Sequence, residues 1–299
     1  MKFAVLSSSS SGNSIYVESG DTRILVDAGL SCKELCNRLD VVLNNRPYEI
    51  DPTQKLASIT PLNDDGSVYT EKINQKDLLS KLNGICITHE HGDHVSGIPV
   101  LSKKCEVPLF ATYNTSEAAT YSFFKGDPNR FAELPWNVVT ECSEFELGDL
   151  KITPFTIPHD VSGPVAFVID DGKHKLGIAT DMGVPTETTR LFLSDCDALV
   201  LEFNHDLDML LESDRCWDLK CRVRGDRGHL SNAQAQELLS SIATDRLKSV
   251  FLAHISFDCN TVPLAHNSCR ETLVKLGMHD QVQIYNPHEH LCKVIELDC

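Results

Sequence analysis

The sequence has no long hydrophobic run. Its 299 residues are 41% hydrophobic, but no apolar stretch approaches the roughly 20 residues that a membrane-spanning helix needs. The first apolar run, Met1–Leu6, gives way at once to serines, which does not fit a secretory signal. We therefore expect a cytoplasmic protein that does not contact a membrane.

The sequence also lacks any Cys-x-x-Cys pair, although it contains 12 cysteines. The nearest pairs are Cys32 with Cys36 and Cys216 with Cys221, and neither has the spacing of a zinc ribbon or a redox motif. Other cysteines lie inside apolar runs, where a thiol behaves as a small buried hydrophobe. The thiols are expected to be reduced and mostly structural.

The sequence also has no excess of positive charge. The 27 basic residues are outnumbered by 43 acidic ones, and the net charge is −16. This balance argues against a protein that simply coats nucleic acid, but not against a nuclease, because metal ions and a local basic segment can hold phosphates. One such segment contains Lys220, Arg222, Arg224 and Arg227. We predict that this basic segment contacts the substrate; a solvated loop is the alternative.

What the sequence does contain is a dense cluster of metal-binding side chains. Residues 88–94 have the pattern Thr-His-x-His-x-Asp-His, directly after a short apolar run. Imidazole nitrogens and carboxylate oxygens suit zinc and similar divalent ions. The spacing lets His89 and His91 bind one ion, while Asp93 and His94 can reach a second. An isolated His-x-His pair is as often a hydrogen-bonded core pair, but the whole pattern after a strand indicates a metal site.

Histidines and acids recur where other apolar, strand-like runs end. The residues at these ends are His159, Asp181, Glu202 and His254. Because such strands alternate with helices along the chain, we predict a layered α/β domain with one site at a sheet edge. Taken singly, His159 also fits a surface histidine, and Asp181 and Glu202 also fit helix caps. Asp27 ends an earlier strand and is predicted to orient metal ligands, again with a helix cap as the alternative.

Two further segments suit the binding of an anion. Residues 7–13 are five serines followed by Gly-Asn, predicted as a loop whose hydroxyl and N–H groups, with Asn13, contact the substrate; a flexible polar turn is the alternative. His229 precedes a Ser-x-x-Gln capping box that starts at Ser231. It should therefore lie at a helix N-terminus, where backbone N–H groups favour phosphate.

The chain is predicted to form a single domain over residues 1–299, with an inserted loop at about 41–77. Turn signals are packed closely in that insert, which has no recognisable chemistry, and one hairpin is expected around Asn63–Gly66. Further helices are predicted over Val95–Lys104, with Pro99 in the first turn, and over Cys269–Leu276.

With these motifs together, the sequence resembles the metallo-β-lactamase fold, a four-layer αββα sandwich. Nearly end to end it is similar to the YycJ/VicX-like (WalJ) family of bacterial proteins. The stretches that carry this resemblance are Met1–Phe3, Gly12–Ser14, Val26–Ser31, Thr88–His94, Gly177–Asp181, Leu201–Asp206, Gly228–Asn232 and Leu252–Ser256. The serine-rich residues 7–11 contain less glycine than is usual in this family, and the 41–77 insert is longer.

The resemblance implies two divalent ions per chain, zinc or manganese with iron also compatible. By position, one ion would be held by His89, His91 and His159. The other would be held by Asp93, His94 and His254. Asp181 would bridge the two ions, and Asp27 matches the supporting aspartate of the family.

The resemblance also implies a DNA nuclease that acts 5′→3′ on duplex ends in mismatch repair, and a link to a cell-wall two-component system. The residues themselves indicate metal-assisted hydrolysis, in which two ions share a hydroxide that attacks phosphorus. We predict a catalytic set of Asp93, His229 and Glu202. His229 would stabilise the transition state or protonate the leaving oxygen, and Glu202 and His205 would orient their neighbours.

Two other functions stay open on the sequence. One is a metallo-hydrolase of another substrate, such as RNA, a small phosphodiester, a thioester or a lactone. The other is a metal-retaining regulator without turnover. The complete ligand set argues against the regulator, because loss of catalysis leaves such sites free to erode.

Overall fold

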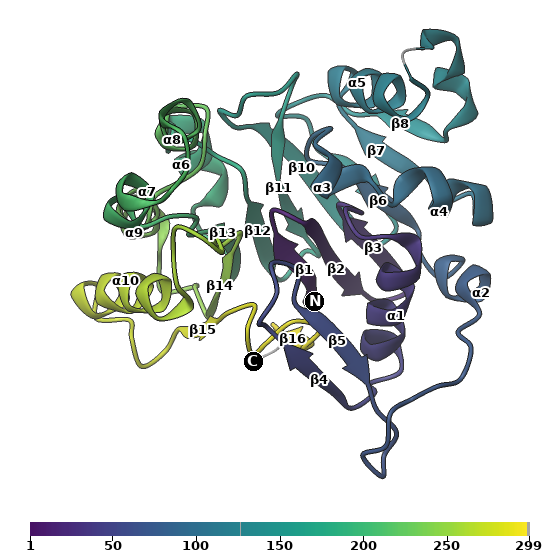
Figure 1. Ribbon diagram of the computed structural model, residues 1–299, viewed down its shortest axis with the longest axis horizontal. Coiled ribbons are helices and arrows are strands. Elements are labelled where there is room, and N and C mark those ends of the chain that lie inside the picture. Colours follow the sequence, from purple (N-terminus) through teal and green to yellow (C-terminus); the bar gives the residue numbers. More distant parts are fainter. Residues whose placement is uncertain (126, 298–299) are drawn as a thin grey trace.

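Two seven-stranded sheets lie face to face at the centre of the molecule, with helices on both outer sides (Figure 1). The computed structural model describes residues 1–125 and 127–297. The predicted αββα sandwich is therefore confirmed. No helix in these two ranges combines the length and the apolar character that crossing a membrane requires.

The first sheet has the order β16-β1-β2-β3-β6-β7-β8. Strands β1, β2 and β3 form an antiparallel meander, and β3, β6, β7 and β8 run parallel. The strands are β1 (Lys2–Ser9), β2 (Gly12–Ser19), β3 (Thr22–Val26), β6 (Gly84–Cys86), β7 (Leu109–Ala111), β8 (Trp136–Val138) and β16 (Ile295–Glu296).

The second sheet has the order β15-β14-β13-β12-β11-β10-β9, and β12 to β15 run parallel. Its strands are β9 (Phe145–Leu147), β10 (Leu150–Thr156), β11 (Val165–Asp170), β12 (Lys175–Ala179), β13 (Ala198–Glu202), β14 (Ser249–Ala253) and β15 (Gln283–Tyr285).

The helices cover the outer faces of the sheets (Figure 1). They are α1 (Cys32–Leu43), α2 (Gln75–Leu79), α3 (Gly92–Val95), α4 (Ile98–Lys104), α5 (Tyr113–Phe123), α6 (Glu187–Leu193), α7 (Leu207–Glu212), α8 (Trp217–Arg224), α9 (Asn232–Ile242) and α10 (Val262–Lys275), with the 3₁₀ helix η1 (Pro128–Glu133). The predicted capping box is present at α9: Ser231 accepts from the N–H of Gln234, whose side chain accepts from the N–H of Ser231.

The apolar runs form strands that are buried on both faces. Along β13, Ala198 and Val200 pack between the two sheets, while Leu199 and Leu201 pack against the outer helices. Alternate side chains point to opposite faces of a strand, so such a run supplies two cores at once. This explains why the central strands are continuously apolar in sequence rather than alternating.

The carboxyl ends of several strands meet at one edge of the sandwich, where the chain turns sharply. Asp27 after β3, Asp181 after β12 and His254 after β14 have φ angles of 63°, 60° and 52°. The left-handed region is uncommon for residues other than glycine, and strain of about 1–3 kcal/mol is characteristic of functional sites. These turns aim three polar side chains at a common point above the sheets.

The prediction of a serine-rich loop over residues 7–13 is wrong. Ser7–Ser9 belong to β1 and Gly12 and Asn13 to β2, with Ser8 paired to Asn13, so the connection is a two-residue turn. The hydroxyls are used within the protein: Ser7 donates to the carbonyl of Gly12, and Ser8 accepts the backbone N–H of His254. The serines at the end of β1 therefore have the composition of a loop, although their backbone is paired in the sheet.

Two helix predictions differ from the structure. Residues 95–104 belong to two short helices, α3 and α4, because Gly97 packs against the chain before α1. Its N–H donates to the carbonyl of Ala28, and a Cβ there would lie 2.3 Å from the carbonyl oxygen of Leu30. The helix predicted at Cys269 starts at Val262, because Pro263 lies in its first turn, where a proline costs no hydrogen bond.

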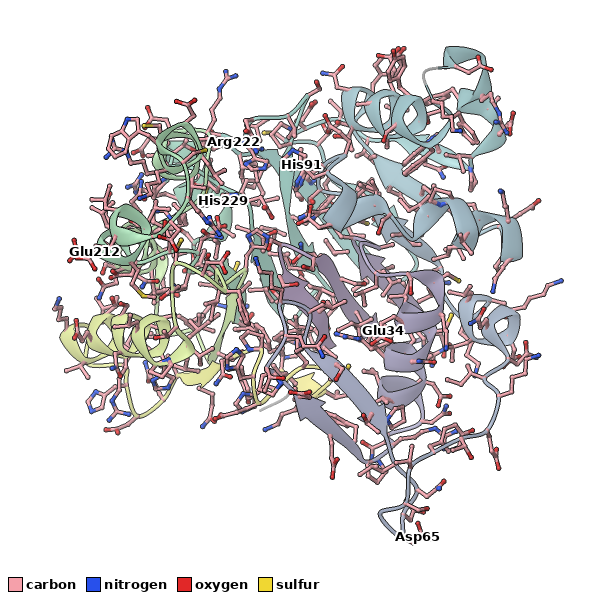
Figure 2. All side chains as sticks on the ribbon, viewed as in Figure 1. Glu34, Asp65, His91, Glu212, Arg222 and His229 are labelled. Carbon is pink, nitrogen blue, oxygen red and sulfur yellow. The ribbon has the colours of Figure 1, made fainter. Side chains whose placement is uncertain are left out.

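The insert at 41–77 has more structure than predicted. It contains the hairpin of β4 (Tyr48–Asp51) and β5 (Ser58–Pro61), followed by the expected turn at Asn63–Gly66. The two turns of the insert point in different directions. Asp65, in the second turn, lies at the tip farthest from His91 and His229 (Figure 2).

Candidate metal centre

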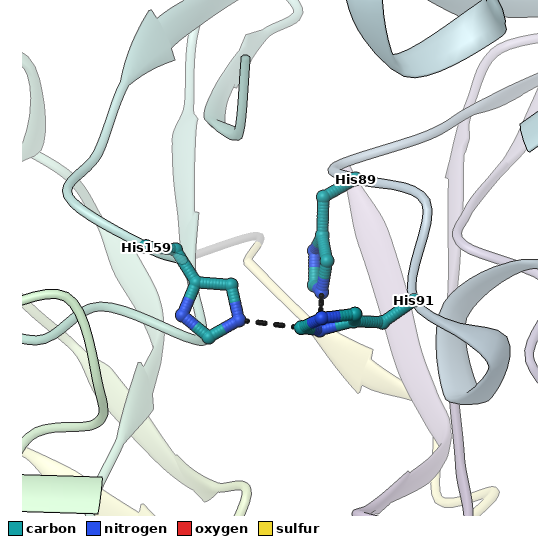
Figure 3. A group of neighbouring side chains, drawn as sticks. All are labelled: His89, His91 and His159. Atoms are coloured by element: carbon teal, nitrogen blue, oxygen red, sulfur yellow. Dashed lines mark hydrogen bonds between the residues drawn. The ribbon is translucent and has the colours of Figure 1, made fainter. Parts of the chain in front are cut away.

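Three histidines from two sheets meet at the edge just described (Figure 3). His89 and His91 follow β6 in the first sheet, and His159 follows β10 in the second. Nδ1 of His91 lies 3.1 Å from Nε2 of His89 and 3.3 Å from Nε2 of His159. One nitrogen of each ring is within 4.8 Å of the other two, which is close enough for all three to share one ion.

A second group lies beside the first and contains Asp93, His94 and His254. Oδ2 of Asp93 is 3.5 Å from Nε2 of His94 and 3.8 Å from Nε2 of His254. Asp181 lies between the two groups: its carboxylate is 3.2 Å from His94 and 3.5 Å from His254, and it also groups with His89. The structure thus brings together all seven residues predicted as ligands.

Asp27 fixes the orientation of His94. Its carboxylate accepts from Nδ1 of His94 at 2.7 Å and from the N–H and hydroxyl of Thr88 at 2.9 and 2.8 Å. A proton on Nδ1 leaves the lone pair of Nε2 free toward Asp181 and Asp93, the arrangement typical of a metal-ligating histidine. Asp27 is not the cap of α1, because Ser31 caps that helix.

Glu202 fixes two further histidines. It is fully buried at the end of β13 and accepts from Nδ1 of His229 at 2.8 Å, from Nδ1 of His254 at 3.1 Å and from the N–H of Met182 at 2.9 Å. Burial alone would raise the pKa of Glu202, but His229 and the other donors lower it to about 2. The carboxylate is therefore ionised and does not cap a helix, since Asp206 caps α7.

His159, Asn13 and His205 differ in how they contact the two ligand groups. Nδ1 of His159 lies 3.1 Å from the carbonyl of Gly228, which leaves its Nε2 toward His91. Asn13 is 5% exposed, and its amide lies 3.0 Å from Nε2 of His94 and 3.2 Å from Asp93, so it borders the ligand group rather than the open cleft. His205 is buried and its Nδ1 makes no hydrogen bond with the described residues, so its orienting role stays a prediction.

The donors fit divalent ions. Oδ2 of Asp181 and Nε2 of His254 are buried and make no hydrogen bond with the described residues, which is rare for buried polar atoms unless an ion or water satisfies them. Burial would lower the pKa of His254, yet Asp181 and its other acidic neighbours raise it to about 10. Buried carboxylates that stabilise a positive charge on His254 this strongly can stabilise a bound metal cation in place of the proton.

Lys220, Arg222 and Arg224 lie on α8 rather than in a loop, Arg227 lies in the turn after it, and these side chains have different partners. Arg222 donates to Asp160, next to His159, and lines the cleft over the metal ligands. Lys220 donates to the carbonyl of Leu211, and Arg224 lies over the ring of Trp217. Arg227 is exposed and does not line that cleft. Of the four residues only Arg222 lines the cleft, because successive positions of a helix face different sides and Arg227 lies beyond α8. Substrate contact by the segment stays a prediction.

The cleft has a volume of about 600 Å³. His91, Asp93, Asp181, His229 and His254 form its floor. His91, His229 and Arg222 come from opposite halves of the molecule and gather at the gap between them (Figure 2). The rim includes cations that the sequence analysis missed, Lys55 and Arg215. No local pattern marks either of them, since each is an isolated basic residue far from the ligands in sequence.

Two residues that hold the backbone of His254 in place were also not predicted from the sequence. The side-chain amide of Asn204 donates to the His254 carbonyl at 2.8 Å, and Ser8 accepts its N–H at 2.7 Å. Asn204 lies just after the end of β13, and this position could have indicated a role at the site. The same position is shared by His205, so it does not distinguish the two residues. Ser8 belonged to the segment predicted as a loop.

Residues 22–255 match the family described as Beta-lactamase superfamily domain. The chain therefore belongs to the β-lactamase superfamily, as a metal-dependent hydrolase of the metallo-β-lactamase fold. Within this superfamily it is YycJ-like, as its resemblance predicted. It is 29% identical to exodeoxyribonuclease YycJ of Bacillus anthracis over 278 residues, which are 93% of this chain and 90% of that protein.

Two further comparisons agree with this placement. Exodeoxyribonuclease WalJ of Streptococcus pneumoniae strain D39 is 28% identical over 287 residues, 95% of this chain and 93% of that protein. The crystal structure of the metallo-β-lactamase fold protein YhfI from Bacillus subtilis superposes with a TM-score of 0.61 at 16% identity and covers 98% of both chains. The likeness to YhfI concerns the fold alone.

Proposed function

We propose that the protein is a phosphodiester hydrolase that uses two divalent ions, zinc or manganese, and acts as a 5′→3′ exonuclease on double-stranded DNA. The observation that carries this proposal is the pair of ligand groups joined by Asp181 at the floor of a cleft with basic residues on its rim. Two relatives that match nearly the whole chain are named exodeoxyribonucleases, which supports DNA as the substrate.

The residues present would hold two ions. The first set is His89, His91 and His159. The second set is Asp93, His94 and His254. Asp181, between the sets, would contact both ions. The chemistry that divalent ions supply in such a site is activation of water and neutralisation of charge on the phosphoryl oxygens.

His229 would deliver a proton to the leaving oxygen. The ionised carboxylate of Glu202 accepts the Nδ1 proton of His229, so that Nε2 is the atom available for proton transfer. The side chain is 21% exposed and lines the cleft, whereas Glu202 is sealed beneath it. Glu202 therefore acts through His229 and His254 and does not touch the substrate.

The test is purified protein of measured metal content on four substrates: duplex DNA labelled at either 5′ or 3′ end, single-stranded DNA, RNA, and bis(p-nitrophenyl) phosphate. We expect metal-dependent release of mononucleotides from duplex DNA, with the 5′ label released first. Hydrolysis of RNA or small esters with none of DNA would contradict the proposed substrate. Stoichiometric metal without hydrolysis of any substrate would support a regulator instead.

Asp181→Ala is the matched variant for this assay. Because Asp181 groups with ligands of both sets, its loss should abolish binding of metal and hydrolysis of every substrate together. Metal analysis by mass spectrometry beside the activity assay checks this expectation. A variant that keeps both ions and full turnover would remove Asp181 from the bridging position.

A further inference from the structure

The 41–77 insert reaches the cleft at one point. Lys55 lies in the turn between β4 and β5, and its Nζ is 3.1 Å from Oδ2 of Asp258, four residues after His254. Both side chains also line the cleft. The turn of the insert is thus part of the wall around the metal ligands, although the insert shows no chemical motif in sequence.

The carboxylate of Asp258 holds a second cation. Arg215, from the connection between α7 and α8, donates to Oδ2 of Asp258 at 3.2 Å, and it too lines the cleft. One carboxylate therefore gathers two basic side chains from segments that lie far apart in the sequence. On another part of the rim, Asp160 pairs with Arg222 in the same way. The rim carries three cations against two aspartates, in a chain whose net charge is −16.

The Lys55–Asp258 pair is exposed enough to exchange partners, and Arg215 is 25% exposed. The side chains of Lys55 and Asp258 are 56% and 41% exposed. Ion pairs at such positions contribute only about 0–1 kcal/mol to stability. A phosphate that enters the cleft can therefore take over Lys55 or Arg215 at little cost, and the resulting charge-assisted hydrogen bonds resemble those of known phosphate contacts.

We propose that Lys55 and Arg215 form a binding site for backbone phosphates of the nucleic acid, and that the β4–β5 hairpin of the insert is a wall of the substrate channel. Asp258 is a positioning residue that holds both cations toward the cleft until phosphate replaces it. This inference rests on the proposed function and names the residues that bind the polymer away from the metal ions.

The experiment compares Lys55→Ala, Arg215→Ala and the double variant with Lys72→Ala. Lys72 is an exposed lysine of the same insert that does not line the cleft, so this control removes the same charge from the same segment. Kinetics on end-labelled duplex DNA are measured at several salt concentrations. Bis(p-nitrophenyl) phosphate serves as a substrate too small to span the metal ligands and Lys55.

We expect each cleft variant to raise KM for duplex DNA roughly five- to tenfold with kcat preserved. Each should also reduce the slope of log(kcat/KM) against log[salt] by about one. Metal content and turnover of the small diester should stay at the wild-type level, and Lys72→Ala should match the wild type throughout. Equal salt slopes for Lys55→Ala and Lys72→Ala would overturn the inference.

Asp258→Asn separates phosphate binding from a structural role. It keeps an oxygen acceptor for both cations but removes the competing charge, so KM for duplex DNA should fall roughly two- to threefold. A rise in KM like that of Lys55→Ala would mean that the ion pairs only hold the loops together, and would overturn the inference. Loss of DNA hydrolysis in the unmodified protein, with the small diester still cleaved, would instead count against the proposed function.

Discussion

Glu202 shows how a single buried carboxylate can serve two sites. It accepts from His254, a predicted ligand, and from His229, the predicted proton donor, and both bonds involve Nδ1. Such partners select the tautomer and the ring orientation of the histidines they hold. Glu202 therefore links a proposed metal ligand to the proposed proton donor through two hydrogen bonds.

Glu202→Gln should weaken both functions. Both imidazole N–H groups bond to Oε1, while Oε2 accepts the backbone N–H groups of Met182 and Leu230. An amide must therefore set its NH₂ donor against either the two backbone N–H groups or the two histidines. We expect metal affinity to fall by about 10- to 100-fold and turnover to fall with it. Titration of metal into the apoprotein measures the first effect. The control is Glu212→Gln, an exposed position on α7; if the two variants bind metal equally well, Glu202 does not orient the ligands.

His229→Ala should separate proton transfer from metal binding. The variant is expected to keep both ions but to lose about 10²–10⁴-fold in turnover on DNA, the usual contribution of a general acid. A p-nitrophenolate leaving group needs no proton, so the defect on bis(p-nitrophenyl) phosphate should be much smaller. Equal losses on the two substrates would point to a role other than protonation of the leaving oxygen.

For single residues, the sequence indicated the candidate metal ligands but not the basic residues on the rim of the cleft. His89, His159 and His254 could be predicted because they follow apolar runs that must be strands. Arg222 could not be distinguished from Lys220, since the difference lies in which side of α8 each one faces. Lys55 could not be found at all, because its contact with Asp258 joins residues 203 positions apart.

At the scale of elements, the turn between β11 and β12 shows how the edge opposite the site is fixed. The carboxylate of Asp171 accepts the N–H groups of His174 at 2.8 Å and Lys173 at 3.0 Å, and the hydroxyl of Ser19 at 3.1 Å. Ser19 belongs to β2, so this bond joins the two sheets. Burial would raise the pKa of Asp171, but the N–H groups of His174 and Lys173 hold it well below its usual value.

Asp171→Asn should destabilise the protein in a pH-dependent way. A carboxyl group whose pKa is lowered by folding contributes stability above its unfolded pKa, about 3.9, and this contribution is lost as the pH falls toward its folded pKa. We expect a loss of about 1–3 kcal/mol at pH 7 that shrinks below pH 4.

Urea unfolding of the two proteins at pH 7, 5 and 3.5 measures that loss. Asp245→Asn, an exposed aspartate before β14, is the control. A constant difference at all three pH values would show that the charge of Asp171 is not responsible.

Elements were predictable where burial alone specifies them. The central strands, such as β13, are continuously apolar, and the residue predicted at the end of that run, Glu202, is its last residue. The division between α3 and α4 depends instead on the close approach of Gly97 to Ala28, which no periodicity reveals. The left-handed turns at Asp27, Asp181 and His254 were equally invisible, although they aim the side chains that the strand ends made predictable.

At the scale of the whole molecule, the predicted ligands come from both sheets. His89 and His91 extend from the first sheet, while Asp181 and His254 extend from the second. An apolar core joins the sheets along their facing surfaces, but at the site edge the contacts are between polar groups that lack full hydrogen bonding. Bound ions would therefore link the two sheets at the edge where the apolar core ends.

Removal of metal should lower the stability of the entire domain. A ligand that binds only the folded state stabilises it by RT ln(1 + [L]/Kd), about 4 kcal/mol at a thousandfold excess over Kd. For a chain of this length that corresponds to a fall in Tm of roughly 8 °C in the presence of a chelator. Calorimetry with and without EDTA measures the shift, and readdition of zinc or manganese should restore it. Asp181→Ala, which is expected to bind no metal, should show the same Tm with and without EDTA. If the chelator lowered the Tm of that variant as much as that of the wild type, the effect would come from metal bound elsewhere, and the ligands at the sheet edge would not be what joins the two sheets.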